Sequence, residues 1–150
     1  MELVRNADIN LLIRFVLVLF LLYIMTREDL KDRELTLRWI VIFALAGLAF
    51  ELLSDSRDIA GMLSGAGIGA VMVALSAITS GGIGLGDGLV VIAVGFTLGF
   101  SATFAVVMTS FLAAALYALF LTVVKKKSKK TRYPYMPFLF FSYVGMLPLL

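Results

Sequence analysis

The chain has 150 residues, 61% of them hydrophobic, with a net charge of +3 and a mean hydropathy of +1.03, whereas soluble domains are only about 45–50% apolar. This composition excludes an ordinary soluble domain and indicates an integral membrane protein, in which 150 residues can hold about six spanning helices of about 17–25 residues each. The chain contains neither Cys nor His, which excludes disulfides, thiolate metal sites and cysteine or histidine catalysis, so carboxylates must do any enzymatic chemistry.

Six apolar segments follow one another and predict an all-α membrane protein with six transmembrane helices in a single domain over residues 1–150. The first segment carries Arg14 and is followed by charged residues rather than by a small-residue cleavage site, so it is interpreted as a retained helix and not as a signal peptide. The fourth segment is short and is tightly joined to the fifth. The predicted helices are Ile9–Thr26, Thr36–Leu53, Ile59–Thr79, Asp87–Phe100, Ala102–Val124 and Met136–Leu150.

The basic residues predict the orientation in the cytoplasmic membrane, because Lys and Arg concentrate in cytoplasmic loops. Ten of the thirteen fall in two loops that six helices place on one side. They are Arg27, Lys31, Arg33 and Arg38 in the first loop, and Lys125, Lys126, Lys127, Lys129, Lys130 and Arg132 in the fifth. The loop at 81–86 is then also cytoplasmic, and both termini are outside. The fifth-loop cluster is interpreted as an anchor at the lipid bilayer, without a role for nucleic acid.

Two features inside the predicted helices call for tertiary partners. Gly61, Gly65 and Gly69 recur every four residues, the spacing at which small residues let membrane helices approach closely. Arg14 must either extend toward the membrane surface or meet a polar partner, which the sequence does not identify.

Asp87 is the only charged residue between Asp58 and Lys125, and it follows a glycine-rich string at 82–86. An ionised acid in or near a bilayer costs roughly 2.5–3.5 kcal/mol, so a functional role is the first hypothesis. The alternative is a helix N-cap at the membrane surface, since Asp is a favoured capping residue. Gly84, Gly86 and Gly88 would leave the backbone open to the close approach of an extended substrate.

The predicted topology places the end of the first helix at the same depth as Asp87. The first loop offers four acids, and spacing alone does not choose among them: Glu28, Asp29, Asp32 and Glu34. Two carboxyl groups held close together share a proton, so that one acts as base toward a water while the other polarises a peptide carbonyl. This aspartyl protease chemistry needs neither a metal nor a cofactor.

Several motifs resemble one family of membrane proteases. The Gly84–Asp87 string matches the GxGD motif of intramembrane aspartyl proteases, and Asp29–Leu35 is similar to the aspartate-containing first loop of the type IV prepilin and preflagellin peptidases. Gly95 and Gly99 fall where that family has glycines in its fourth helix, and Pro134–Leu139 is similar to the start of its last helix. The resemblance extends from about Tyr23 to Tyr143.

The resemblance implies a GxGD aspartyl protease fold in which Asp29 and Asp87 form the catalytic pair and face the cytoplasm. It implies an aspartic endopeptidase that removes the basic leader peptides of type IV pilin-like precursors at the membrane surface. Two positions depart from the family: Leu35–Leu37 replaces the usual Ile-Pro-Asn, and Leu89 replaces a Lys. Lacking a cysteine-rich segment, the chain is expected to be a peptidase without a methyltransferase domain.

Three alternatives remain open. A protease of the presenilin or signal-peptide-peptidase kind shares the GxGD motif but cuts within its substrate helix. A small ion- or proton-coupled transporter would use Asp87 to bind and release a cation and would leave Asp29 dispensable. An inactive relative could act as a scaffold. Glu28, Asp32 and Glu34 are interpreted as surface charges.

Overall fold

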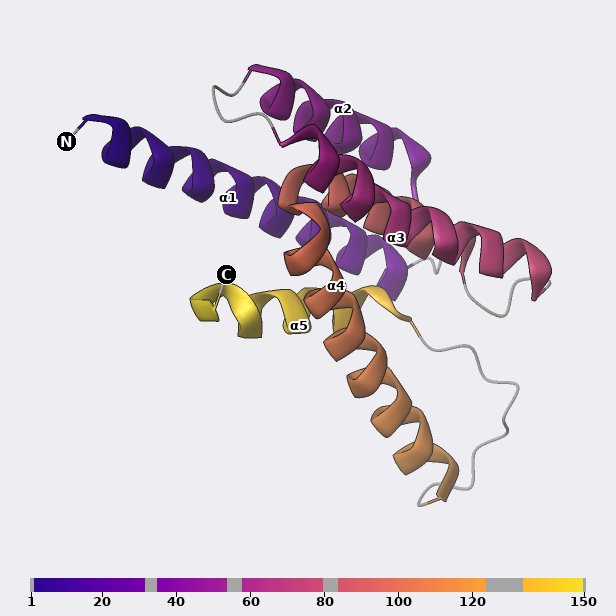
Figure 1. Ribbon diagram of the computed structural model, residues 1–150. Coiled ribbons are helices and arrows are strands. Elements are labelled where there is room, and N and C mark those ends of the chain that lie inside the picture. Colours follow the sequence, from indigo (N-terminus) through magenta and orange to yellow (C-terminus); the bar gives the residue numbers. More distant parts are fainter. Residues whose placement is uncertain (1, 32–34, 54–57, 80–83, 124–133, 150) are drawn as a thin grey trace.

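The computed structural model describes residues 2–31, 35–53, 58–79, 84–123 and 134–149, and all of its regular elements in these ranges are helices (Figure 1). They are α1 (Glu2–Lys31), α2 (Leu37–Leu53), α3 (Ile59–Ile78), α4 (Leu85–Val123), α5 (Met136–Met146) and the 3₁₀ turn η1 (Leu147–Leu149). The predicted all-α class is therefore confirmed for the described residues. Within the described ranges, three helices are long and apolar enough to cross a membrane: α1 from Ile9 to Lys31, α3 and α4. The count of six spans stays a prediction.

Helix α4 bends sharply at Gly99, close to the break that the sequence predicted between Phe100 and Ala102. Gly99 has φ 74° and ψ −174°, a backbone conformation that is essentially restricted to glycine. At 1.5 Å per residue, 39 straight helical residues would extend roughly 58 Å, about twice the thickness of the apolar bilayer core. The bend gives α4 two segments of different direction, and the second runs away from α3 in Figure 1.

Glycines let α3 and the first half of α4 pack backbone against backbone. A Cβ atom on Gly65 would lie 2.6 Å from the carbonyl oxygen of Gly95, and one on Gly95 would overlap the backbone of Gly65. Gly69 lies in the same way against the backbone of Ile92. The close approach predicted from the spacing is confirmed for Gly65 and Gly69. The Gly61 backbone also lies near Gly99 of α4, where a Cβ atom would be 3.6 Å from the Gly61 carbonyl oxygen. The Asp58 carboxylate accepts a hydrogen bond from the Gly61 N–H at 2.8 Å and caps α3.

Helix α1 continues past the predicted end at Thr26 as far as Lys31. Of the four acids of the expected first loop, Glu28 and Asp29 lie on this helix, while Asp32 and Glu34 lie outside the described residues. Because α1 is continuous here, packing against other helices can orient the Asp29 side chain.

Helix α5 packs between the end of α1 and α4 (Figure 1). Its buried face is formed by Met136, Leu139 and Tyr143, which join a core containing Leu22 and Met25 of α1. The Tyr143 hydroxyl donates a hydrogen bond to the Phe15 carbonyl oxygen at 3.0 Å, so its polar atom is satisfied inside an apolar contact.

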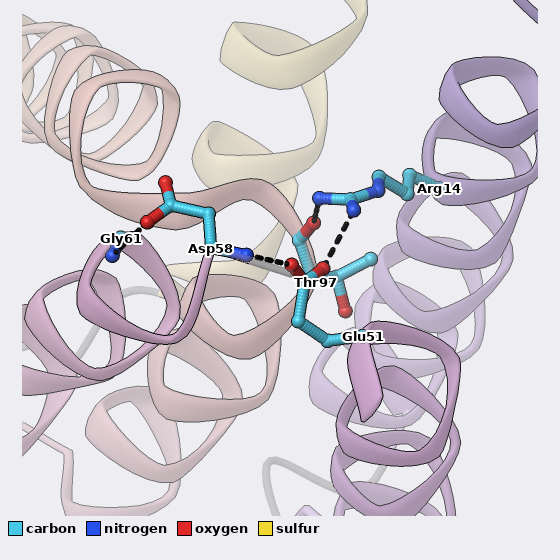
Figure 2. A network of polar contacts seen from close by, with 5 residues as sticks. All are labelled: Arg14, Glu51, Asp58, Gly61 and Thr97. Atoms are coloured by element: carbon cyan, nitrogen blue, oxygen red, sulfur yellow. Dashed lines mark hydrogen bonds and ion pairs between the residues drawn. The ribbon is translucent and has the colours of Figure 1, made fainter. Parts of the chain in front are cut away.

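Arg14 of α1 meets polar partners on α2 and α4 (Figure 2). Its guanidinium forms an ion pair of 2.6 Å with Glu51 of α2 and donates to the Thr97 carbonyl oxygen, 3.4 Å away and just before the bend in α4. Glu51 also accepts a hydrogen bond from the Asp58 N–H at 2.8 Å. The Glu51 carboxylate thus connects α2 with α1 and the start of α3, and Arg14 extends the network to the bend of α4.

Candidate active site

Asp29 is the buried acid of the last turns of α1, with 8% of its surface exposed. Its Oδ2 accepts a hydrogen bond of 3.0 Å from the backbone N–H of Met136, the first residue of α5. The N-terminus of a helix favours negative charge because its first N–H groups have no partner within the helix. The start of α5 therefore orients this carboxylate through a contact that spans 107 residues of sequence.

Asp87 lies in the first turn of α4 and is half-buried. Its N–H donates to the Gly84 carbonyl oxygen at 3.1 Å, and its carboxyl group accepts a backbone hydrogen bond from Gly84. An acid in the first helical turn that reaches back to the start of the helix is a capping arrangement. Capping and a catalytic role are compatible, since the capping bond orients the carboxyl group at the helix end.

The structure brings Asp29 and Asp87 together, although 58 positions separate them in sequence. The two carboxyl groups are close enough to interact electrostatically, and Asp87 also interacts with the hydroxyl of Tyr135. Two acids and the start of α5 thus meet where α1 ends and α4 begins. Such a pair can hold one proton between them and carry out acid and base steps together.

The three glycines around Asp87 have different surroundings. Gly88 is buried against Val73 of α3, where a Cβ atom would lie 2.9 Å from the Val73 backbone nitrogen. Gly86 faces the Leu35 side chain, and Gly84 lies under the carboxyl group of Asp87 itself. Helix packing accounts for the glycine at 88, while the substrate-approach role of Gly84, Gly86 and Gly88 stays a prediction.

Glu28, the neighbour of Asp29, points elsewhere. Its carboxylate is partly exposed and accepts a hydrogen bond of 2.9 Å from the Thr36 N–H, just before α2. This bond gives Glu28 a local role at the start of the next helix. No group of three or more acids that could hold a metal occurs among the residues the structure describes.

Two polar residues at the site were not singled out from the sequence as site residues. They are Ser110, in the second half of α4, and Tyr135, directly before α5. Their hydroxyl groups form a hydrogen bond, and the Tyr135 ring packs on Phe111 with centroids 5.2 Å apart. Burial raises the pKa of Tyr135, the Ser110 bond lowers it and the charge of Asp87 raises it, so the phenol stays neutral. A Ser within a largely apolar segment was the available sequence signal for this contact, and its complete burial is seen only in the structure.

Comparison with protein families gives one match relevant to this geometry. The model of the type IV leader peptidase family matches residues 15–119, which is 105 of the 150 residues. The matched region contains both Asp29 and Asp87 and ends before α5. No curated protein and no solved structure matches the chain.

Proposed function

Because the chain belongs to the type IV leader peptidase family, we propose that it is a membrane-embedded aspartic endopeptidase with a GxGD fold, with Asp29 and Asp87 as its catalytic pair. The observation that carries the proposal is that these two carboxyl groups, at the end of α1 and the start of α4, lie close enough to interact electrostatically. Membership in this family supports peptide-bond hydrolysis as the reaction, and the neighbouring carboxyl groups of Asp29 and Asp87 are suited to that chemistry.

The proposed reaction is the hydrolysis of a peptide bond by an activated water. One carboxylate takes a proton from the water, while the protonated partner donates to the carbonyl oxygen under attack and stabilises the charge that develops there. The same groups then return a proton to the leaving amine. Only the two acids and the water take part, so no cofactor is required.

The proposed substrates are pilin-like precursors whose basic leader peptide precedes an apolar helix. Cleavage at the cytoplasmic surface follows from the orientation predicted by the basic loops, which places the end of α1 and the start of α4 on the cytoplasmic side with both termini outside. The apolar part of the precursor would lie in the bilayer beside the helices. A cut inside the substrate helix would instead favour a presenilin-like specificity.

The decisive experiment is cleavage of a synthetic precursor, with a basic leader followed by an apolar helix, by the purified protein in lipid. Asp29→Asn and Asp87→Asn should each abolish cleavage, since neither can then share a proton with its partner. Glu28→Gln is the matched control, because it neutralises an adjacent acid that bonds to Thr36, and it should leave the rate within about twofold of wild type.

Full cleavage by Asp87→Asn would refute the mechanism. No cleavage of several such precursors by folded wild-type protein would refute the proposed function, and cation transport in vesicles that needs Asp87 but not Asp29 would then support the transporter alternative.

A further inference from the structure

The two residues at the start of α5 contact both helices that carry the candidate acids. The Met136 N–H donates to Asp29 of α1, while the neighbouring Tyr135 hydroxyl bonds to Ser110 of α4 and interacts electrostatically with Asp87. The Met136 side chain is fully buried, so this turn is held in the core rather than on the surface.

Two polar contacts hold the Ser110 hydroxyl group at this turn. It lies 2.8 Å from the Val107 carbonyl oxygen, to which it can donate, and it forms a hydrogen bond with the Tyr135 hydroxyl in which either group can be the donor. A phenol bonded to a fixed partner has a defined position, and so has the peptide unit that follows it.

We propose that Ser110 and Tyr135 are positioning residues, which hold the start of α5 so that the Met136 N–H fixes the orientation of Asp29 toward Asp87. The inference rests on the proposed function and adds two residues to its machinery. Neither residue need touch the substrate. The Tyr135–Ser110 bond acts on the reaction through the Met136 peptide, and its loss lets the first turn of α5 shift relative to α1.

The test uses variants that remove only hydroxyl groups. Tyr135→Phe keeps the ring that packs on Phe111, and Ser110→Ala keeps the helix. Each should lower kcat for the synthetic precursor about 10-fold to 100-fold, the loss that about an ångström of misplacement can cause, with KM within about twofold. Because both variants break one bond, the double variant should lose no more than the more damaging single one.

Tyr143→Phe is the matched control. It removes another buried hydroxyl from the same helix, but its partner Phe15 lies 14 residues before Asp29, roughly 21 Å away along α1. This variant should lower the unfolding midpoint and leave kcat unchanged. If Tyr143→Phe and Tyr135→Phe lower kcat equally, the effect is one of general stability and the inference is wrong.

A second measurement does not depend on cleavage. Infrared spectra of protein labelled with ¹³C in its Asp carboxyl groups contain a band for Asp29, identified by its loss in Asp29→Asn. That band should shift in Tyr135→Phe and in Ser110→Ala, and stay in place in Tyr143→Phe. An unshifted band in the first two variants would overturn the inference even if the wild-type protein cleaves. A shifted band in a protein that cleaves no precursor would refute the proposed function alone.

Discussion

The ion pair between Arg14 and Glu51 should hold α1, α2 and the bend of α4 together. The Glu51 side chain is 3% exposed and that of Arg14 is 20% exposed. Water therefore has little access to either charged group and cannot fully hydrate it when its partner is removed. Arg14→Met keeps most of the apolar stem and removes the charge. It leaves the buried Glu51 carboxylate with the Asp58 N–H as its remaining described partner, which should destabilise the protein by about 3–5 kcal/mol.

Glu51→Gln should cost less, about 1–3 kcal/mol, because the amide oxygen can still accept from Asp58 and Arg14 can move toward the surface. The double variant has no uncompensated buried charge. It loses the Arg14 contacts with the Thr97 carbonyl and the Phe50 ring, which together contribute about 1–2 kcal/mol. The coupling energy between the two substitutions should therefore be at least about 2 kcal/mol, as for residues in direct contact.

The assay is equilibrium unfolding in mixed micelles, followed by the fluorescence of Trp39, the single tryptophan. Arg27→Met is the matched control, since it makes the same change at an exposed position of α1 and should alter stability by no more than about 0.5 kcal/mol. If Arg14→Met costs as little as Arg27→Met, or if the two single costs simply add in the double variant, the structural argument is refuted.

Three further predictions concern the bend, the helix contact and the acid pair. Gly99→Ala should destabilise by about 1–3 kcal/mol in the same assay, because its φ and ψ are restricted to glycine, whereas Gly67→Ala, with open space around it, should be neutral or stabilising. Gly95→Ala should also cost about 1–3 kcal/mol, because its methyl group would overlap the Gly65 backbone; a stability equal to that of Gly67→Ala would contradict this contact. Cleavage should fall as alkaline pH removes the proton shared by Asp29 and Asp87, and a kcat that keeps rising until the protein unfolds would rule out a shared proton.

The sequence alone predicted the helical class, because apolar segments in a membrane satisfy their backbone groups within a helix. Some bounds were wrong: α1 extends beyond both predicted ends, and the predicted fourth and fifth helices form the bent α4. The predicted start of the third helix at Ile59 and that of the last at Met136 agree with the structure. Asp87 was identified because placing a carboxylate within such an apolar segment has a high free-energy cost, so that a functional role is the first hypothesis. The glycines at 95 and 99 were also evident, although their roles in helix contact and bend required the packed structure.

The tertiary structure decided which side chains meet. The partner of Arg14 is 37 positions away in Glu51, and the N–H that orients Asp29 belongs to Met136, 107 positions away. Local patterns carry no signal for such pairs, because helix periodicity describes one helix and not the neighbour it packs against. The choice of Asp29 over Glu28 as the buried acid has the same origin: the two are adjacent in sequence, and only the packing of α5 against the end of α1 makes them different.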